Sequence, residues 1–389
     1  MAGSAAQTIM TCLASLRRHL EMDVAFVGRV EDGRRIFDFV DAEASDCPVQ
    51  PGLSDPIEDT YCGRVISRLI PQLIPDAGAE PGVADLAVTA ELPVGAHLSV
   101  PLHRSDGEVM GTLCCFSHEP DETLRQRDLR YLSMFADMVS SQLETLVDDD
   151  RERTARTARI RAVLDGGGPM MAMQPIVHIA NRHVRGFEAL SRFPENPGWS
   201  PQQWFAEAGA LGLGVELEAS AVAGALATLP RLPSEALLSV NVSAEALRCD
   251  TVLALLTGDH AERLVVELTE HTRIEDYGSI VDELAALRGS GARLAVDDAG
   301  SGWAGLEHIL QLQPEVLKLD RALVARVDRH PGRQAMIEAM VGFADRMGAL
   351  LVAEGVETVE ESACLTSLGV VYGQGYLLGR PTLSFVDGR

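Results

Sequence analysis

The chain contains almost no lysine. Of the 33 lysine and arginine residues in 389, 32 are arginine, and Lys318 is the only lysine. Arginine therefore serves as the cation nearly everywhere, so the position of Lys318 is expected to need something that arginine cannot provide. Lysine can lose its proton when it is buried, whereas arginine cannot. Lys318 is hence a candidate functional residue.

Positive charge of any kind is scarce. The formal net charge is −24 at pH 7, and no segment is rich in lysine or arginine. Proteins that bind nucleic-acid phosphates or anionic membrane surfaces normally carry such a segment. The sequence therefore argues against a nucleic-acid polymer as a partner. An anionic substrate would need another source of positive charge, and bound metal ions are the obvious candidate.

Long hydrophobic runs and paired cysteines are also missing. No stretch approaches the roughly 18 apolar residues of a membrane-spanning helix, and the first 20 residues have no continuous apolar core. The seven cysteines are odd in number and form no C-x-x-C pair, which favours reduced thiols over a disulfide framework or a zinc ribbon. These absences predict a soluble, cytoplasmic protein with no membrane insertion.

Residues 1–147 are typical of a mixed α+β domain. The segments 23–40 and 97–116 each place an Asp-Gly pair between apolar runs, which predicts two β-hairpins. Residues 125–147 have the spacing of an amphipathic helix. Residues 148–168 are predicted to be a helical linker, because a charged run is followed by three glycines at 166–168. A solvated helical extension without a signalling role is the alternative.

Residues 169–389 alternate short apolar runs with amphipathic segments. Eight strands with intervening helices over about 220 residues predict a TIM-type barrel, and hence an α/β fold. The candidate strands are 172–177, 186–190, 237–242, 263–268, 292–297, 315–320, 350–354 and 370–374.

Polar residues lie within or just after seven of these eight runs. Catalytic residues of such barrels lie at the C-terminal ends of the strands. Any one of these residues could be an ordinary solvated strand end, but seven together favour a site. Carboxylate and amide oxygens favour Mg²⁺ or Mn²⁺ over zinc. The residues are Glu188, Asn241, Glu267, Asp297 with Asp298, Lys318 with Asp320, Glu354 and Gln374.

Asp297 and Asp298 are adjacent at the end of a candidate strand. Neighbouring side chains on a strand point to opposite sides, so both can face one site only if the strand breaks there, which Gly300 and Gly302 allow. One carboxylate could then bridge two cations about 3.5–4 Å apart. Taken alone, the pair would be better explained as an ordinary strand exit with both carboxylates in water.

The chain from about 170 to 385 resembles the EAL-domain cyclic-di-GMP phosphodiesterases. Glu188, Ala189 and Leu190 spell the EAL motif itself. The resemblance implies a modified TIM barrel, two divalent cations (Mg²⁺ or Mn²⁺), and hydrolysis of cyclic di-GMP to linear pGpG. The other matching segments are QPIV (174–177), FEALSR (187–192), VNVS (240–243), VELTE (266–270), VDDAGSG (296–302), LKLD (317–320), AEGVET (353–358) and GQGYLLGRP (373–381).

The resemblance also implies roles for individual residues. The metal ligands would be Glu188, Asn241, Glu267, Asp297 and Asp298, with help from Asp320 or Glu354. The residues that orient or deprotonate the attacking water would be Lys318 and Glu354, supported by Glu357. The residues that contact substrate would be Gln174, Arg192 and Gln374.

The loop after the two aspartates departs from the family. The family pattern is close to D-D-F-G-T-G-Y-S-S-L, whereas this chain has DDAGSGWAGL at 297–306. In the family this loop couples metal binding to dimerisation, and a glutamate resembling Glu270 tethers it. We therefore expect an active enzyme with unusual turnover or loop regulation.

The N-terminal domain resembles a GAF sensor domain more loosely, through SVPLHRSDGEVMGTLCCFS (99–117) and RDLRYLSMFADMVSSQLE (127–144). The GAF ligand stays unknown. Cys62 could suggest a chromophore thiol, but a buried structural cysteine is the preferred interpretation.

Together, the sequence predicts a metal-dependent cyclic-di-GMP phosphodiesterase regulated by a GAF domain and forming a homodimer through the connector helix. The main alternative is a catalytically silent EAL receptor that binds cyclic di-GMP or a protein partner. A third possibility is a vestigial barrel, with GAF ligand binding as the main output. No GGDEF motif is present, so synthesis of cyclic di-GMP is not expected.

Overall fold

The computed structural model describes residues 2–84, 86–195, 197–268, 280–299 and 309–383. The chain divides into two compact units, Met1–Ala155 and Arg156–Arg389. The division falls inside the predicted linker, residues 148–168. Each unit is described by itself below.

The first unit is built on an antiparallel sheet of six strands in the order β3-β2-β1-β6-β5-β4. Both predicted hairpins are present, as β1–β2 and β5–β6. Asp32 and Gly33, which connect β1 to β2, have φ angles of 48° and 73°. A two-residue type I′ turn requires positive φ at both positions, so this Asp-Gly pair determines the hairpin. The strands are Val24–Glu31 (β1), Arg34–Ala42 (β2), Ser54–Pro56 (β3), Leu73–Ile74 (β4), Ala96–His103 (β5) and Val109–Ser117 (β6).

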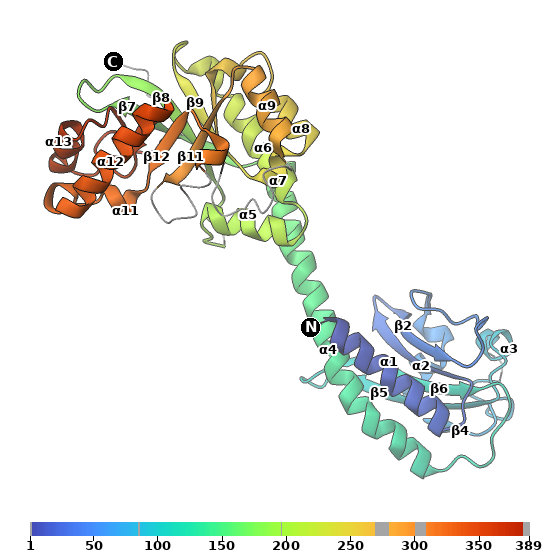
Figure 1. The fold of residues 1–389 in the computed structure, drawn as a ribbon. Helices are drawn as coiled ribbons and strands as arrows, with labels where there is room; N and C mark the ends of the chain where they lie inside the picture. The colour runs from blue at the N-terminus through green and yellow to red at the C-terminus, as the bar shows by residue number, and fades with distance from the viewer. Residues whose placement is uncertain (1, 85, 196, 269–279, 300–308, 384–389) are drawn as a thin grey trace. The chain divides into compact units, whose positions relative to one another are not determined.

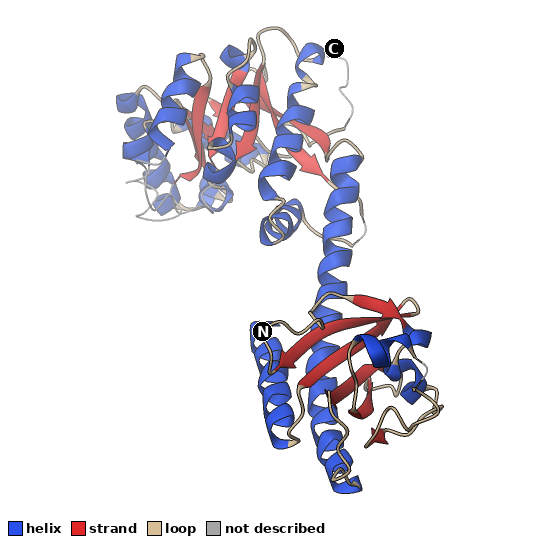
Figure 2. Ribbon diagram, turned by 90° about the vertical axis from the view of Figure 1, so that its right-hand side faces the viewer, coloured by secondary structure: helices blue, strands red, loops and turns tan. Residues whose placement is uncertain are grey.

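Helices cover the two faces of this sheet differently. Helices α1 (Ala2–His19) and α4 (Gln126–Asp165) pack on one face, as Figure 2 shows. Helices α2 (Tyr61–Ile66) and α3 (Ala87–Glu91) contribute to the core on the other face. Because side chains alternate along a strand, β6 sends Cys115 into the first core and Cys114 into the second. Helix α1 was not predicted from the sequence.

The predicted helix 125–147 and the charged segment after it form one continuous helix, α4, of 40 residues. It ends just before the three glycines, of which Gly167 and Gly168 have φ angles of 94° and 91°. Left-handed glycines are a common helix stop. The C-terminal end of α4 belongs to the second unit, within which Ile160 packs into a cluster with Trp204.

The second unit is a closed barrel in the order β10-β11-β12-β13-β14-β7-β8-β9, which confirms the predicted barrel. Each of its eight strands overlaps one candidate strand. β7 pairs antiparallel with β8 and β14, and the other pairs are parallel. The strands are Met170–His178 (β7), Val184–Arg192 (β8), Leu237–Val242 (β9), Leu264–Leu268 (β10), Arg293–Ala299 (β11), Val316–Leu319 (β12), Leu350–Ala353 (β13) and Tyr372–Gly373 (β14).

Helices surround the barrel strands on the outside (Figure 1). Outward-facing side chains such as Leu238, Val266 and Leu317 join these helices in one large core. No helix in the described part of the chain is long and apolar enough to cross a membrane. The helices are Pro201–Ala210 (α5), Gly214–Leu226 (α6), Ala244–Leu247 (α7), Asp250–Leu256 (α8), Val281–Gly289 (α9), Arg321–Val324 (α11), Pro331–Met347 (α12) and Val359–Ser367 (α13).

Candidate active site

The barrel interior holds an apolar layer and a polar layer, one strand period apart. Val265, Ala295, Val316 and Val352 form a small apolar cluster. Successive same-side residues on a strand are two apart, so the next inward-facing residues are polar. Side chains on neighbouring strands thus form the site because each lies two residues after an inward-facing apolar residue. The polar residues two positions on are Glu267, Asp297, Lys318 and Glu354.

Lys318 lies at the centre of the polar layer. Its ammonium nitrogen is 2.6 Å from Glu354 and 2.8 Å from Glu267. It is also 3.4 Å from Glu188 and 4.0 Å from Asp297. The lysine is 1% exposed, so these carboxylates replace water as its surroundings. The only lysine in the sequence is thus a buried ion-pair centre.

The carboxylates outnumber the ammonium group that neutralises them. Burial raises the pKa of Glu267 to about 8, and the negative charge of Glu188 adds to that effect. Burial also raises the pKa of Glu354 to about 7, although Lys318 opposes the shift. Crowded, buried carboxylates of this kind resist ionising together. The cluster therefore has more carboxylates than one ammonium group can neutralise, and a further cation would favour their ionised forms.

Glu188 and Lys318 are stabilised in their charged forms. Burial works to raise the pKa of Glu188, but the Lys318 charge and hydrogen bonds from Gln374 and Asn241 outweigh it, so the pKa is lowered. For Lys318, burial is likewise outweighed by the carboxylates, and the pKa rises well above its usual value. Lys318 is accordingly a charged ammonium in this arrangement, and not the neutral amine that burial alone would favour.

Amide side chains hold the Glu188 carboxylate in place. The side-chain nitrogen of Gln374 donates to Glu188 at 2.6 Å and to Gln174 at 2.9 Å, and Asn241 donates to Glu188 at 3.1 Å. Gln174 in turn donates to the carbonyl oxygen of Gly379. The buried side-chain oxygen of Gln374 has no hydrogen-bond partner among the described residues, which leaves an acceptor available. Four predicted site residues are therefore directly linked.

A pocket opens beside this cluster, with a volume of about 260 Å³. Its wall includes Glu188, Asp297, Glu354 and Gln374 from the polar layer. It also includes Glu357, which accepts a hydrogen bond from Arg321 at 2.7 Å. Glu357 is thus at the pocket wall and is not part of the Lys318 ion-pair cluster.

The strand that carries the two aspartates is irregular at that point. Val296 pairs with Leu317 and Ala299 pairs with Leu319, so Asp297 and Asp298 together face Lys318 across the pairing. Two residues against one is the pattern of a β-bulge, which redirects side chains. The expected break in the strand is therefore a bulge at the aspartates themselves. The side chain of Asp298 lies outside the described residues.

Other predicted site residues have different surroundings. The carboxylate of Asp320 accepts a hydrogen bond from the backbone of Ala322 and caps α11. Arg192 is half-buried at the end of β8 and donates to the carbonyl oxygen of Ser191. Glu270 and the loop at 300–306 lie outside the described residues. The roles assigned to these residues stay predictions.

Sequence reasoning missed Ser239 and Arg321. Ser239 is buried and its hydroxyl donates to Glu267. It lies two residues before Asn241 on β9, so the strand period could have identified it. Arg321 follows Asp320 directly and lines the pocket, but no spacing rule distinguishes it from the many other arginines.

The donor set fits divalent metal ions by its chemistry. It consists only of carboxylate and amide oxygens, which Mg²⁺ and Mn²⁺ prefer. Its surplus of buried carboxylates over ammonium groups fits a cation as well. Among the described side chains, no three acidic, histidine or cysteine groups converge as metal ligands, because the carboxylates gather around Lys318. The residues that would hold a metal are Glu188, Asn241, Glu267 and Asp297.

Comparisons with known families agree with this fold. Residues 157–381 match the EAL domain, and residues 3–144 match the GAF domain. The first match covers more than half of the chain. The chain therefore belongs to the EAL domain family and carries an N-terminal GAF domain.

Its relatives include proteins named as cyclic di-GMP phosphodiesterases. RocR of Pseudomonas aeruginosa, "Cyclic di-GMP phosphodiesterase", is 36% identical over 134 residues, covering 34% of each chain. PdeG of Escherichia coli, "Probable cyclic di-GMP phosphodiesterase", is 29% identical over 240 residues, covering 59% of this chain and 47% of that protein. The chain spans 36%, 30% and 47% of the length of three curated relatives it matches.

Solved structures share the fold. The PaMucR phosphodiesterase in complex with c-di-GMP is 28% identical, with a TM-score of 0.52, covering 59% of this chain and 97% of that one. The EAL enzyme Bd1971 in its cAMP-bound form covers 93% of this chain and 91% of its own, with a TM-score of 0.53. At 19% identity, this second likeness supports the fold alone.

Proposed function

We propose that this chain hydrolyses cyclic di-GMP to linear pGpG at the polar end of its barrel. The observation that carries the proposal is the buried Lys318 with Glu188, Glu267, Asp297 and Glu354 around it. Relatives and a solved structure named for cyclic di-GMP support the choice of substrate. The alternative, a silent receptor, would have no need to bury so many mutually repelling carboxylates.

We further propose two divalent cations, Mg²⁺ or Mn²⁺, as cofactors. Glu188, Asn241, Glu267 and Asp297 would hold the first, and Asp297 and Asp298 would share the second. Asp320 or Glu354 would assist. When bound, such cations supply a nucleophile from water and neutralise phosphate charge.

The protein groups would divide the remaining work. Lys318 keeps Glu267 and Glu354 in place through its short ion pairs. It would also contribute positive charge near the reacting phosphate. Glu354 lines the pocket, so it is placed to accept a proton from the attacking water, with Glu357 on the same wall. Gln374 holds Glu188, and its free side-chain oxygen can accept a hydrogen bond from substrate.

Substrate phosphate would be bound at the pocket edge by arginine. Arg192 lies four residues after Glu188 on β8, so the two share one face of the strand. A planar guanidinium can donate two parallel hydrogen bonds to a phosphate. Gln174 would contact substrate beside Gln374, to which it is already hydrogen-bonded.

We also propose a role for each of the three segments of the chain, based on the GAF and EAL domains that it contains. Residues 1–147 would sense an unidentified ligand, 148–168 would transmit the signal, and 169–389 would carry the phosphodiesterase. The chain would act as a homodimer through the connector, and Glu270 would tether the loop after Asp298.

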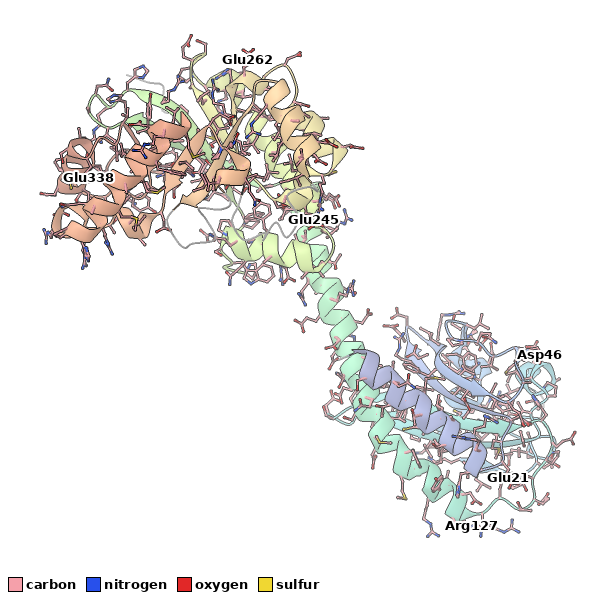
Figure 3. The ribbon with its side chains drawn as sticks, in the orientation of Figure 1. Glu21, Asp46, Arg127, Glu245, Glu262 and Glu338 are labelled. Carbon is pink, nitrogen blue, oxygen red and sulfur yellow. The ribbon has the colours of Figure 1, made fainter. Side chains whose placement is uncertain are left out.

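The proposal is tested by measuring pGpG formation with the full chain, cyclic di-GMP and Mg²⁺ or Mn²⁺. Glu354→Gln should lower kcat by about 100-fold or more, the usual scale for losing a positioned acid–base group. Glu338→Gln is the matched control, because Glu338 is exposed on α12 and points away from the barrel (Figure 3). Equal loss in both variants would contradict a specific role for Glu354. Substrate binding without product in the unmodified chain would favour the receptor.

A further inference from the structure

A second cluster of reactive side chains is buried in the first unit, far along the chain from the barrel site. It lies between the sheet and α2, in the core that contains Phe26, Phe37 and Phe116. It brings together several groups that can be charged, donate protons or act as nucleophiles. Its members, each at most 3% exposed, are Arg35, Cys62, His97, Ser99, Thr112 and Cys114.

Two cysteines from distant parts of the sequence meet in this cluster. Cys62 lies on α2 and Cys114 on β6, and their sulfur atoms are 3.7 Å apart. A disulfide bond is about 2.05 Å long. The sulfurs would therefore have to approach by about 1.7 Å to form the bond. Both cysteines are free in this structure.

Arg35 gives this pair an electrostatic asymmetry. One of its terminal nitrogens lies 3.9 Å from the Cys62 sulfur, and its guanidinium group is 4.0 Å from the centre of the Phe37 ring. Asp55 anchors the guanidinium group from the other side. A nearby cation stabilises a thiolate, which is the reactive form of cysteine.

The two thiols consequently differ in acidity. The hydrogen bond from Cys114 lowers the pKa of Cys62 to about 6, with the Arg35 charge assisting and burial opposing. Burial raises the pKa of Cys114 well above its usual value, and the neighbouring Cys62 adds to the shift. Ser99 and Thr112 lie 3.1 Å from the Cys114 sulfur and hold it in place. Cys62 is thus suited to be the nucleophile and Cys114 the resolving thiol.

The other cysteines lack this arrangement. Burial raises the pKa of Cys115 to about 12, and it also raises the pKa of Cys12 and Cys364. Cys115 is next to Cys114 in sequence, but it belongs to the core on the opposite face of the sheet. Cys249 and Cys364 are the two cysteines that are not fully buried. If exposure alone decided reactivity, they would react first.

We infer that Cys62 and Cys114 form a redox-modification site, which a hydroperoxide such as hydrogen peroxide converts to a disulfide. The Cys62 thiolate attacks one peroxide oxygen, the O–O bond breaks, and hydroxide leaves, which gives a sulfenic acid on Cys62. The Cys114 sulfur then attacks the Cys62 sulfur, the S–O bond breaks, and the thiol proton leaves with the hydroxyl group as water. The peroxide is reduced, the two thiols are oxidised, and an added dithiol reverses the bond by exchange.

The test treats the fully reduced full-length chain with graded hydrogen peroxide, blocks remaining thiols, and maps tryptic peptides by mass spectrometry. Cleavage after Arg35, Arg64, Arg104 and Arg125 yields one peptide with Cys47 and Cys62 and another with Cys114 and Cys115. The expected result is a cross-link between these two peptides that dithiothreitol removes. It should form before Cys249 and Cys364 are oxidised.

Matched variants assign the bond. Cys47→Ala and Cys115→Ala should keep the cross-link, whereas Cys62→Ala and Cys114→Ala should lose it. Cys114→Ala should also accumulate a sulfenic acid on Cys62 that dimedone traps. Fragmentation of the cross-linked peptide from the unmodified chain locates the bond even if a variant fails to fold.

Arg35 is tested by a conservative pair of variants. Arg35→Gln should slow cross-linking about tenfold, because the thiolate loses its cation, and Arg35→Lys should restore most of the rate. Earlier oxidation of Cys249 or Cys364, or a cross-link that persists in Cys62→Ala, would overturn the inference. Because none of these readouts measures hydrolysis, the result is independent of the proposed phosphodiesterase activity.

Discussion

The ammonium nitrogen of Lys318 lies 2.6 Å from a carboxylate oxygen of Glu354, inside a barrel where the lysine is almost completely buried. Lys318 is in β12, and Glu354 directly follows β13, the neighbouring parallel strand. In a chain with one lysine, this contact shows where the ammonium group is needed. It also explains why an arginine, abundant everywhere else, does not stand here.

The first prediction concerns the variant Lys318→Arg and its turnover of cyclic di-GMP. Arginine keeps the charge but replaces a compact ammonium by a planar fork on a longer stem, at a buried position surrounded by carboxylates. The variant should fold but lose about 100-fold or more of kcat for cyclic di-GMP, measured as pGpG formation. A kcat within threefold of the unmodified chain would mean that Lys318 supplies charge alone.

The second prediction concerns metal binding. Mn²⁺ should raise the melting temperature of the full chain, since an ion that binds only the folded state stabilises it. Glu267→Gln should reduce this shift, because it removes one buried carboxylate of the predicted ligand set. Glu262→Gln is the control, as Glu262 is exposed on the outside of the barrel (Figure 3). An unchanged shift in Glu267→Gln would remove Glu267 from the ligand set.

The third prediction concerns the variant Arg192→Lys and its KM for cyclic di-GMP. Lysine keeps the positive charge but cannot form the bidentate contact that a guanidinium makes with phosphate. KM for cyclic di-GMP should rise about tenfold with a smaller change in kcat, which steady-state kinetics would separate. An effect on kcat alone would instead place Arg192 in the chemical step.

The fourth prediction concerns the pH dependence of Cys62. With a pKa of about 6 it is mostly thiolate above about pH 7, so the rate of cross-linking by peroxide should be nearly constant there and decrease as pH falls through about 6. The groups that face it are Arg35 from β2, held by Asp55, and Cys114 from β6. His97 on β5 stays neutral in this range, because burial lowers its pKa to about 3.

To check this prediction, the peroxide reaction is quenched at successive times at several pH values. Peptide mapping then gives the rate at which the cross-link between Cys62 and Cys114 forms. Cys364, whose pKa is raised by burial, serves as the internal comparison, and its reactivity should still be increasing above pH 8. A midpoint for Cys62 near 9, the ordinary value, would show that Arg35 and Cys114 do not activate it.

The barrel was predictable because its signals are local. Each strand is a short apolar run, and the period of two residues places Glu267, Lys318 and Glu354 on inward-facing positions. The Asp-Gly pair at 32–33 likewise predicts its hairpin without any tertiary information. The EAL motif at 188–190 then connected the spacing to a known family, which the family comparison bears out.

Other features depend on contacts that no local pattern encodes. The antiparallel direction of β7 follows from its pairing with β8 and β14, and the bulge at Asp297 and Asp298 from its pairing with β12. The meeting of Cys62 with Cys114 joins residues 52 positions apart. Such long-range register is set by packing, so it appears only in the folded structure.

The central claim is tested most directly by incubating the purified full chain with cyclic di-GMP and Mn²⁺ while binding and product are measured on the same sample. The account predicts stoichiometric binding followed by repeated turnover to pGpG, which a chelator stops and added Mn²⁺ restores. Tight binding of cyclic di-GMP by folded, Mn²⁺-loaded protein without any pGpG would contradict it and identify a receptor.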